Sequence, residues 1–199
     1  MISFSKICKD EPYLMFESFY KKALQKQQTG PEAASVSSLN PNTNEVESRF
    51  VNIKYLNGKK FTFFSNYGSL KANNFENHDQ ISLLFYWNKI HVQIRIKAKI
   101  YRSDEKFSDK HYQERSAEKN ALAHSSRQST PINSYESVVE NFKKTLKLED
   151  QISSRPKYWG GFDILPYYFE FWEGNTYRLN KRTVFQFENE KWKKFFLNP

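Results

Sequence analysis

Residues 155–182, RPKYWGGFDILPYYFEFWEGNTYRLNKR, are the stretch that decides the fold of this chain. The stretch holds two tryptophans, a Gly-Gly doublet, two prolines, and Arg178 and Arg182 at i and i+4. Glycine and proline weaken strand pairing, so an ordinary edge strand explains it poorly. A hydrophobic hairpin end with Trp159 and Trp172 in the core is one alternative. The other is a ligand site, because an indole can cover a planar ring and a guanidinium can stabilise charge on it.

Upstream of this stretch, the periodicity of apolar residues changes from helical to strand-like. Residues 11–27 carry apolar side chains near helical spacing and end at a break around Gly30 and Pro31, which predicts an amphipathic helix. Short β-branched and aromatic segments follow at 34–39, 49–55 and 60–65, separated by PNTN and Asn57-Gly58. These segments predict a meander of antiparallel strands.

The remaining segments suggest how the strands are covered. A short helix is expected at 69–77, then strands at 81–87 and 91–102, the second alternating cleanly between apolar and charged residues. Residues 103–148 are polar and helical in pattern, and the aromatic tail from 167 to 196 returns to strands. The fold class predicted is mainly β with packed helices, an antiparallel barrel with helices outside it.

One domain over residues 1–199 is expected, because the apolar segments are spread evenly along the chain. Its parts would be a helical arm at 1–30, barrel strands at 31–102, a helical insertion at 103–150 and carboxyl-terminal strands at 155–199. The longest apolar runs are too short to span a bilayer, and the amino terminus lacks the apolar core of a secretory signal. The expectation is a cytoplasmic protein with no membrane partner.

The charge and the metal-binding residues narrow the possible partners. The net charge is +9, but Lys and Arg alternate with Asp and Glu along most of the chain, which argues against a nucleic-acid surface. Cys8 is the only cysteine and the four histidines lack ligand spacing, so no metal site is expected. Rossmann, P-loop, α/β-hydrolase and zincin signatures are also absent.

Basic and hydroxyl residues on the expected strands and their following turns are candidates for a phosphate site. A phosphomonoester is held best by arginine forks, ammonium groups and hydroxyl donors together. A solvated basic surface is the simpler alternative for each residue taken alone. The candidates are Arg49, Lys54, Ser65, Ser69, Lys71, Gln93, Arg115, Gln128, Ser129, Arg178 and Arg182.

The stretch 155–182 resembles the carboxyl-terminal signature of the pyridoxamine 5'-phosphate oxidase family, RPxxWGGxxxxPxxxEFWxGxxxRLHxR. Every fixed position is met except one, where Asn180 stands in place of histidine. Upstream, SRFVNIK, FFSNYGSLKANNFENH, ISLLFYWNKIHVQIRI and SSRQS resemble family elements at matching distances. The resemblance covers roughly residues 31–199. It implies an FMN-binding split β-barrel that forms a homodimer, with flavin mononucleotide (FMN) in clefts between the subunits.

The resemblance also implies roles for individual residues. FMN, chiefly its phosphate, would be held by Arg49, Phe64, Ser65, Ser69, Lys71, Gln128 and Ser129, and its ring and ribityl chain by Gln93, Trp172 and Arg182. The substrate phosphate would bind Lys54 and Arg115, with His111, Tyr112 and Lys119 on the same helical segment. Arg178 and Asn180 would face the reacting carbon. The implied reaction is oxidation of pyridoxamine or pyridoxine 5'-phosphate to pyridoxal 5'-phosphate with O2 as acceptor.

Departures from the family pattern cluster on the substrate side and leave three hypotheses open. Asn180 cannot exchange a proton near neutral pH, Leu70 replaces an arginine, and His111 and Lys119 replace a tyrosine and a serine. The amino-terminal arm of longer members is expected to be short. The first hypothesis is a vitamin B6 oxidase. The second is an FMN-dependent oxidase of another ring compound, such as a phenazine precursor, and the third is a flavin or pyridoxal-phosphate binding protein without turnover.

Overall fold

A computed structural model describes all residues from Met1 to Pro199. Its strands are β1 (Ser3–Ser5), β2 (Ala33–Asn40), β3 (Glu45–Asn52), β4 (Tyr55–Asn57), β5 (Lys60–Asn66), β6 (Gln80–Trp87), β7 (Val92–Arg102), β8 (Trp159–Glu173), β9 (Lys181–Glu188) and β10 (Lys191–Leu197). Its helices are α1 (Glu11–Gln25), α2 (Leu70–Asn77), the 3-10 turn η1 (Asn88–Ile90), α3 (Glu105–Gln113), α4 (Ala117–Ser125), α5 (Tyr135–Leu146) and α6 (Glu149–Ile152).

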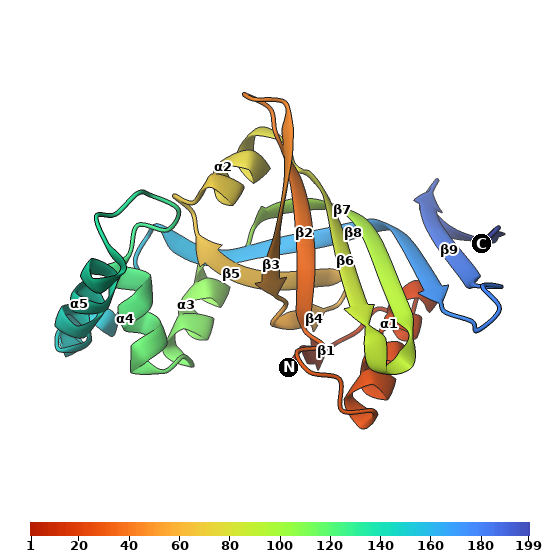
Figure 1. Cartoon of the computed structure of the whole chain (residues 1–199), viewed down its shortest axis with the longest axis horizontal. Coiled ribbons are helices and arrows are strands. Elements are labelled where there is room, and N and C mark those ends of the chain that lie inside the picture. The colour runs from red at the N-terminus through yellow and green to blue at the C-terminus, as the bar shows by residue number, and fades with distance from the viewer.

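A single ten-stranded sheet runs through the chain in the order β1-β4-β5-β8-β7-β6-β2-β3, with β9 and β10 added beside β8. Every pairing is antiparallel except that of β1 with β4, so the expectation of a purely antiparallel sheet is wrong at this one edge. Figure 1 shows β2 and β3 crossing β5 and β8 almost at right angles. The sheet is strongly bent but remains open between β1 and β3, so one chain does not close the expected barrel.

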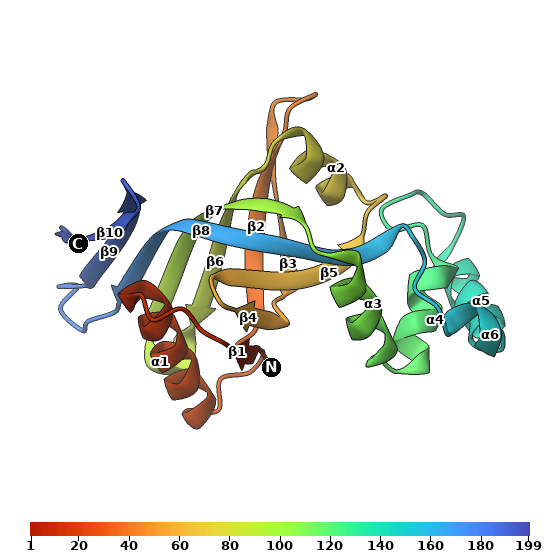
Figure 2. The same cartoon turned by 180° about the vertical axis from the view of Figure 1, so that it is seen from behind.

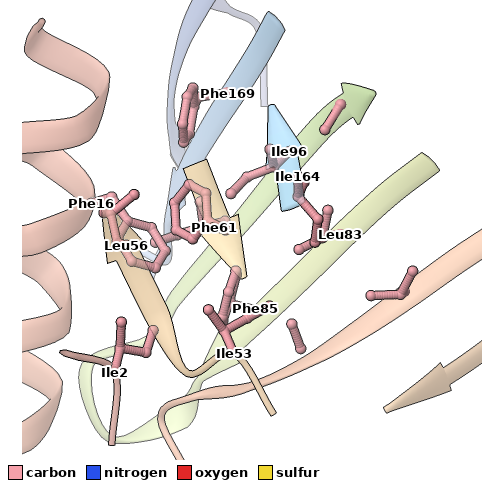
Figure 3. Packing of buried hydrophobic residues seen from close by; sticks show 14 of the residues in the cluster. Ile2, Phe16, Ile53, Leu56, Phe61, Leu83, Phe85, Ile96, Ile164 and Phe169 are labelled. Atoms are coloured by element: carbon pink, nitrogen blue, oxygen red, sulfur yellow. The ribbon is translucent and has the colours of Figure 1, made fainter. Parts of the chain in front are cut away.

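The core lies on the concave side of this sheet and is dominated by aromatic rings. Helix α1 begins at Glu11, with Pro12 in its first turn, and inserts Phe16 between Phe61, Phe85 and Trp87 at ring-centroid distances of 4.8–5.7 Å. Figure 3 shows Phe16 beside Leu56 and Phe61, with Ile96 and Ile164 on the other side of Phe61. As predicted, the apolar residues of β7 are buried while its charged residues face outward.

Strand β8 is the element that joins the two ends of the molecule. It is far longer than the strand expected to start at residue 167, because the Gly-Gly doublet continues the strand instead of breaking it. Gly160 and Gly161 pair with Ser65 and Phe64 of β5. Pro166 is tolerated because the register with β7 shifts beside it, at a bulge between Lys97 and Ala98.

Helices α3, α4, α5 and α6 gather at one end of the molecule, and the β9–β10 hairpin lies at the opposite end, as Figures 1 and 2 both show. The predicted helical segment 103–148 is therefore helical, but it is divided into separate short helices. No helix in the chain combines the length and the apolar composition needed to cross a membrane.

Candidate active site

The predicted site residues form two groups at opposite ends of β8. One group surrounds the end of β5, where Phe64 pairs with Gly161, and the other surrounds the start of β7, where Gln93 pairs with Trp172. Gly161 and Trp172 lie on the same strand, and at the usual rise per residue they are roughly 35 Å apart. This span exceeds the length of a mononucleotide, so one copy of the chain cannot bring both groups to one small ligand.

The first group includes a buried cation that lacks an acidic partner. The Lys71 ammonium, at the start of α2, is 9% exposed and donates to Ser69 Oγ at 3.1 Å, while the Ser69 hydroxyl donates to the Asn66 carbonyl oxygen at 2.7 Å. No ion pair of the chain involves Lys71. Burial, with a contribution from the Arg49 charge, lowers the pKa of Lys71 to about 8. The position therefore favours an anion that would restore the ammonium charge.

Arg49 of β3 is near Lys71 but already has partners. Its guanidinium donates to Ser38 Oγ at 2.7 Å and forms an ion pair with Glu47 at 2.7 Å. Burial lowers the pKa of Arg49, an effect that the Glu47 carboxylate opposes. Asn74 also donates to Glu47, at 3.3 Å. Ser38 and Glu47 thus orient the Arg49 guanidinium, and the Glu47 carboxylate offsets its charge.

Gln128 connects the loop after α4 to the end of β5. Its Oε1 accepts from the Ser65 hydroxyl at 3.2 Å and from the Asn66 backbone N–H at 3.4 Å. Ser129, the next residue, is exposed and has a left-handed backbone with φ of 70°. The structure therefore brings Ser65 and Gln128 together, whereas Ser129 makes no side-chain hydrogen bond.

A cavity of about 240 Å³ lies between β5 and the helical end and is lined by both cations and aromatic rings. Its lining includes Phe64, Ser65, Arg115, Lys119, Gln128 and Trp159. The Arg115 guanidinium lies 4.2 Å from the centre of the Trp159 ring and donates to the Lys119 carbonyl oxygen at 2.6 Å. Its Nη1 is buried without a partner. Buried donors are normally satisfied, so this one is available to an acceptor brought by a ligand.

His111 of α3 packs against Phe64, one of the residues that line this cavity. Its ring stacks on Phe64 with a centroid distance of 3.7 Å and an interplanar angle of 13°, and its Nδ1 lies 2.8 Å from the Tyr55 hydroxyl. Burial and the charges of Arg115, Lys54 and Lys119 lower the pKa of His111 to about 4. His111 is thus neutral near pH 7 in the unliganded chain.

Tyr112 takes a different position from that of its neighbour. Its side chain is 1% exposed, and its hydroxyl donates to the Ile152 carbonyl oxygen at 3.1 Å. Its ring packs edge-on against Trp159 in a small cluster beneath the cavity. The structure therefore gives the Tyr112 hydroxyl a partner on α6 and does not bring it to His111 and Arg115.

The second group lines a cavity of about 530 Å³ at the other end of β8. Tyr86, His91, Trp172, Arg178 and Asn180 contribute to its walls, together with Gly174, Asn175 and Thr176. Arg178 has a left-handed backbone, with φ of 60°, in the loop between β8 and β9. The Asn180 Oδ1 accepts the Asn175 backbone N–H at 3.1 Å, which closes this loop. Asn180 therefore fixes the segment that carries Arg178.

Comparison with known proteins identifies the lineage of this arrangement. The profile described as "Pyridoxamine 5'-phosphate oxidase" matches residues 20–146, and the one described as "Pyridoxine 5'-phosphate oxidase C-terminal dimerisation region" matches residues 159–199. The chain belongs to the pyridoxamine 5'-phosphate oxidase family. A pyridoxine/pyridoxamine 5'-phosphate oxidase of Psychromonas ingrahamii is 34% identical over 197 residues, covering 96% of this chain and 88% of that protein. One from Haemophilus influenzae is 30% identical over 192 residues, covering 96% and 91%.

Solved structures agree with this family assignment at the level of the fold. PhzG from Burkholderia lata, in complex with tetrahydrophenazine-1-carboxylic acid, superposes with a TM-score of 0.90 at 23% identity, covering 96% of this chain and 93% of that one. A pyridoxamine 5'-phosphate oxidase-related, FMN binding protein of Nostoc punctiforme gives a TM-score of 0.74 at 14% identity, covering 92% and 97%. The bent, mainly antiparallel sheet is thus a fold found in this family.

In this member of the pyridoxamine 5'-phosphate oxidase family, one buried carboxylate forms ion pairs with both Arg182 and Arg95. Glu170 is 2% exposed, and its Oε1 accepts two hydrogen bonds from the Arg182 guanidinium at 2.7 and 2.9 Å. Its Oε2 lies 3.5 Å from Arg95 and accepts the Tyr168 hydroxyl at 3.0 Å. Burial and Glu170 raise the pKa of Tyr168 to about 12. Arg182 therefore lies beside Trp172 and is ion-paired with Glu170.

Sequence reasoning did not select four residues that organise the two groups, namely Glu47, Tyr55, Glu114 and Glu170. Three of these carry carboxylates, and a search for cations and hydroxyls that hold phosphate passes over them. Glu170 could have been selected from the sequence, because it is the acidic residue of the EFW motif within an otherwise apolar strand. No feature of the sequence indicates the contact between Tyr55 and Glu114, since it depends on α3 packing over β4.

Proposed function

We propose that this chain is an FMN-dependent oxidase that converts pyridoxamine or pyridoxine 5'-phosphate to pyridoxal 5'-phosphate with O2 as electron acceptor. The observation that carries the proposal is the buried Lys71 ammonium, which has no carboxylate partner and lies next to Arg49. A buried ammonium without a carboxylate calls for an anion, and the half-buried Arg49 guanidinium beside it, already paired with Glu47, can add hydrogen bonds to that anion. Family membership supports an oxidase, and the phosphate of FMN fits the requirement.

The residues of the first group fit the FMN phosphate. Lys71 and Arg49 would provide charge, while the Ser65 and Ser69 hydroxyls and the Gln128 amide would provide neutral hydrogen bonds. Leu70 is 46% exposed and contributes no cation, so Lys71 would carry a larger share of the phosphate binding. When bound, FMN supplies the two-electron acceptor chemistry and its reoxidation by O2.

We place the cofactor between two copies of the chain, because the two groups of site residues stand at opposite ends of β8. One copy would provide the Lys71 end and its partner the end with Gln93, Trp172 and Arg178. The tail that matches a dimerisation region belongs to this second end. In this arrangement the open sheets of two copies form the split β-barrel of a homodimer, each chain contributing one domain.

The protein's own contribution to the reaction is binding and orientation. Arg115 and Lys119 line the 240 Å³ cavity and would hold the substrate phosphate there together with Lys54, and the unpaired Arg115 Nη1 is free to donate to that phosphate. Arg178, on the loop closed by Asn180, would cover the substrate from the partner copy and orient the carbon that is oxidised. Trp172 would cover the flat face of the bound rings and exclude water.

A second candidate is an FMN-dependent oxidase of another ring compound. Asn180 favours it, because this side chain is engaged with the Asn175 backbone N–H and cannot exchange a proton with a substrate. The ligand in the PhzG structure, tetrahydrophenazine-1-carboxylic acid, is one such ring compound. A third candidate, tight flavin or pyridoxal-phosphate binding without turnover, differs from both in giving no flavin reduction.

The proposal is tested by purifying the protein, recording its visible absorbance and adding pyridoxamine 5'-phosphate without oxygen. We expect a flavin band that bleaches on addition and returns with air, with formation of pyridoxal 5'-phosphate. A flavin band that bleaches only with a ring compound lacking the phosphate would select the second candidate. A protein that takes up no FMN would contradict the proposal, and bound flavin that no substrate reduces would select the third candidate.

A further inference from the structure

Three polar side chains, His111, Tyr55 and Glu114, are linked next to Phe64, a residue that lines the cavity beside Arg115. The Tyr55 hydroxyl of β4 lies 2.8 Å from His111 Nδ1 and 3.3 Å from Glu114 Oε2. A phenol has one proton, so it can donate to only one of these neighbours at a time. When it donates to the Glu114 carboxylate, its oxygen is free to accept a proton from His111 Nδ1.

The imidazole is otherwise held by apolar rings and faces only positive charge. Phe64 of β5 stacks on His111, and Trp159 of β8 lies parallel to it at 6.3 Å. Lys54, Arg115 and Lys119 all oppose protonation of the ring. The other ring nitrogen, Nε2, makes no hydrogen bond within the chain and is not among the buried unpaired atoms, so it is open to solvent. Glu114, reached through Tyr55, is the one negative group of this set.

We infer that His111, Tyr55 and Glu114 form a proton relay that makes the cavity selective for doubly charged oxyanions such as a phosphate ester. Burial and the charges of Arg115, Lys54 and Lys119 keep His111 neutral, and a dianion bound among these cations offsets the contribution of the charges. The ring then takes up a proton, donates from Nε2 to the anion and from Nδ1 to Tyr55, and Tyr55 donates to Glu114. A monoanion offsets less of this charge and leaves the ring neutral, so it forgoes one charge-assisted hydrogen bond.

This inference deepens the proposed function, because it concerns the same cavity that would bind the substrate phosphate. It predicts that anion binding is accompanied by proton uptake, so affinity for a dianion rises as pH falls. Sulfate is the suitable probe, since it stays doubly charged across the pH range in which a phosphate ester itself titrates. Nitrate is the matched monoanion, since it keeps its single charge over the same pH range.

The experiment follows the imidazole resonances of the FMN-saturated full chain by NMR during pH titrations with and without sulfate. His111 is assigned by its absence in the His111→Asn variant. We expect saturating sulfate to raise the pKa of His111 from about 4 by two units or more, and nitrate to leave it nearly unchanged. In the Tyr55→Phe variant the rise should be smaller, and sulfate should bind several-fold more weakly at pH 5, between the unliganded and the sulfate-bound pKa of His111.

The Glu114→Gln variant is the surface-located counterpart, because this side chain is exposed and its replacement leaves the aromatic packing in place. With sulfate, it should give the same smaller rise in the pKa of His111 that is expected for Tyr55→Phe. A pKa of His111 that sulfate does not move, or a pH dependence of sulfate affinity that His111→Asn retains, would overturn the relay. These outcomes are independent of oxidase turnover, so a protein with the relay but without turnover would contradict only the proposed function.

Discussion

Gly160 lies so close to Tyr67 that a Cβ atom at position 160 would stand 2.1 Å from the Tyr67 hydroxyl oxygen. At Gly161, a Cβ atom would meet Ser103 Oγ at 2.6 Å. The doublet thus lets the loop after β5 and the start of α3 approach β8 closely. This approach holds the Ser65 and Lys71 end of the site against the helical end.

Gly160→Ala should therefore destabilise the protein by about 2 kcal/mol, since the added methyl group forces the Tyr67 ring out of its position. Urea unfolding measures the loss. In a Tyr67→Ala background the same substitution should cost much less, because the obstructing ring is gone. Equal costs in the two backgrounds would mean that the close approach is not what requires glycine.

Because of the lowered pKa of Lys71, the free energy of unfolding of the flavin-free protein should increase as pH rises above about 8. Its folded pKa is lower than the ordinary value of 10.5, so between these values the unfolded chain binds more protons and stability increases with pH. Unfolding free energies at pH 8 and pH 10 should show this gain in the wild type and not in Lys71→Met. Added FMN should abolish the gain, because phosphate restores the ammonium. A gain that survives in Lys71→Met would assign it to another group.

Glu170→Gln should destabilise the chain by about 3 kcal/mol, because it leaves Arg182 and Arg95 around a neutral buried side chain. Glu188→Gln is the matched control, since its partner Lys193 is exposed and such pairs contribute about 1 kcal/mol or less. Thermal or urea unfolding of both variants provides the comparison. Similar small losses for the two would show that the Glu170 cluster is not a structural requirement.

Asn180→Ala should loosen the loop that carries Arg178, because the Asn175 backbone N–H loses its acceptor. Hydrogen exchange at the Asn175 amide should speed up, and kcat/KM for pyridoxamine 5'-phosphate should fall by roughly tenfold. Asn180→Asp keeps an acceptor oxygen and should keep slow exchange. If hydrogen exchange at the Asn175 amide were unchanged in Asn180→Ala, the Asn180 side chain would not be what holds this loop closed.

Much of the sheet could be predicted because its residues show a local pattern. The alternation from Val92 to Ile100 and the amphipathic pattern of α1 each indicate an element that is buried on one side. The turn formers Asn57-Gly58 indicate the hairpin between β4 and β5. The extent of β8 could not, because Gly160 and Pro166 contradict strand propensity and are explained only by Tyr67 and by a bulge opposite β7. The parallel pairing of the three-residue β1 leaves no such pattern.

The roles of the candidate site residues stay predictions, and their connections could not be predicted from the sequence. Motif positions pointed to Lys71, Gln128 and Arg178, but not to the separation of the first two from the third by the length of β8. The sequence pattern also did not reveal that the Tyr112 hydroxyl donates to the Ile152 carbonyl oxygen, or that Arg182 is ion-paired with Glu170. These facts depend on how helices pack on the sheet, which local periodicity does not encode.

The central claim is that each oxidase site is built from the Lys71 end of one copy and the Arg178 end of another, and subunit mixing tests it most directly. Lys71→Met and Arg178→Ala homodimers should each be nearly inactive with pyridoxamine 5'-phosphate. Random mixing in equal amounts should restore about a quarter of wild-type activity, because half the dimers gain one intact site of two. Activity that stays at the level of the separate variants after verified subunit exchange would contradict a site shared between copies.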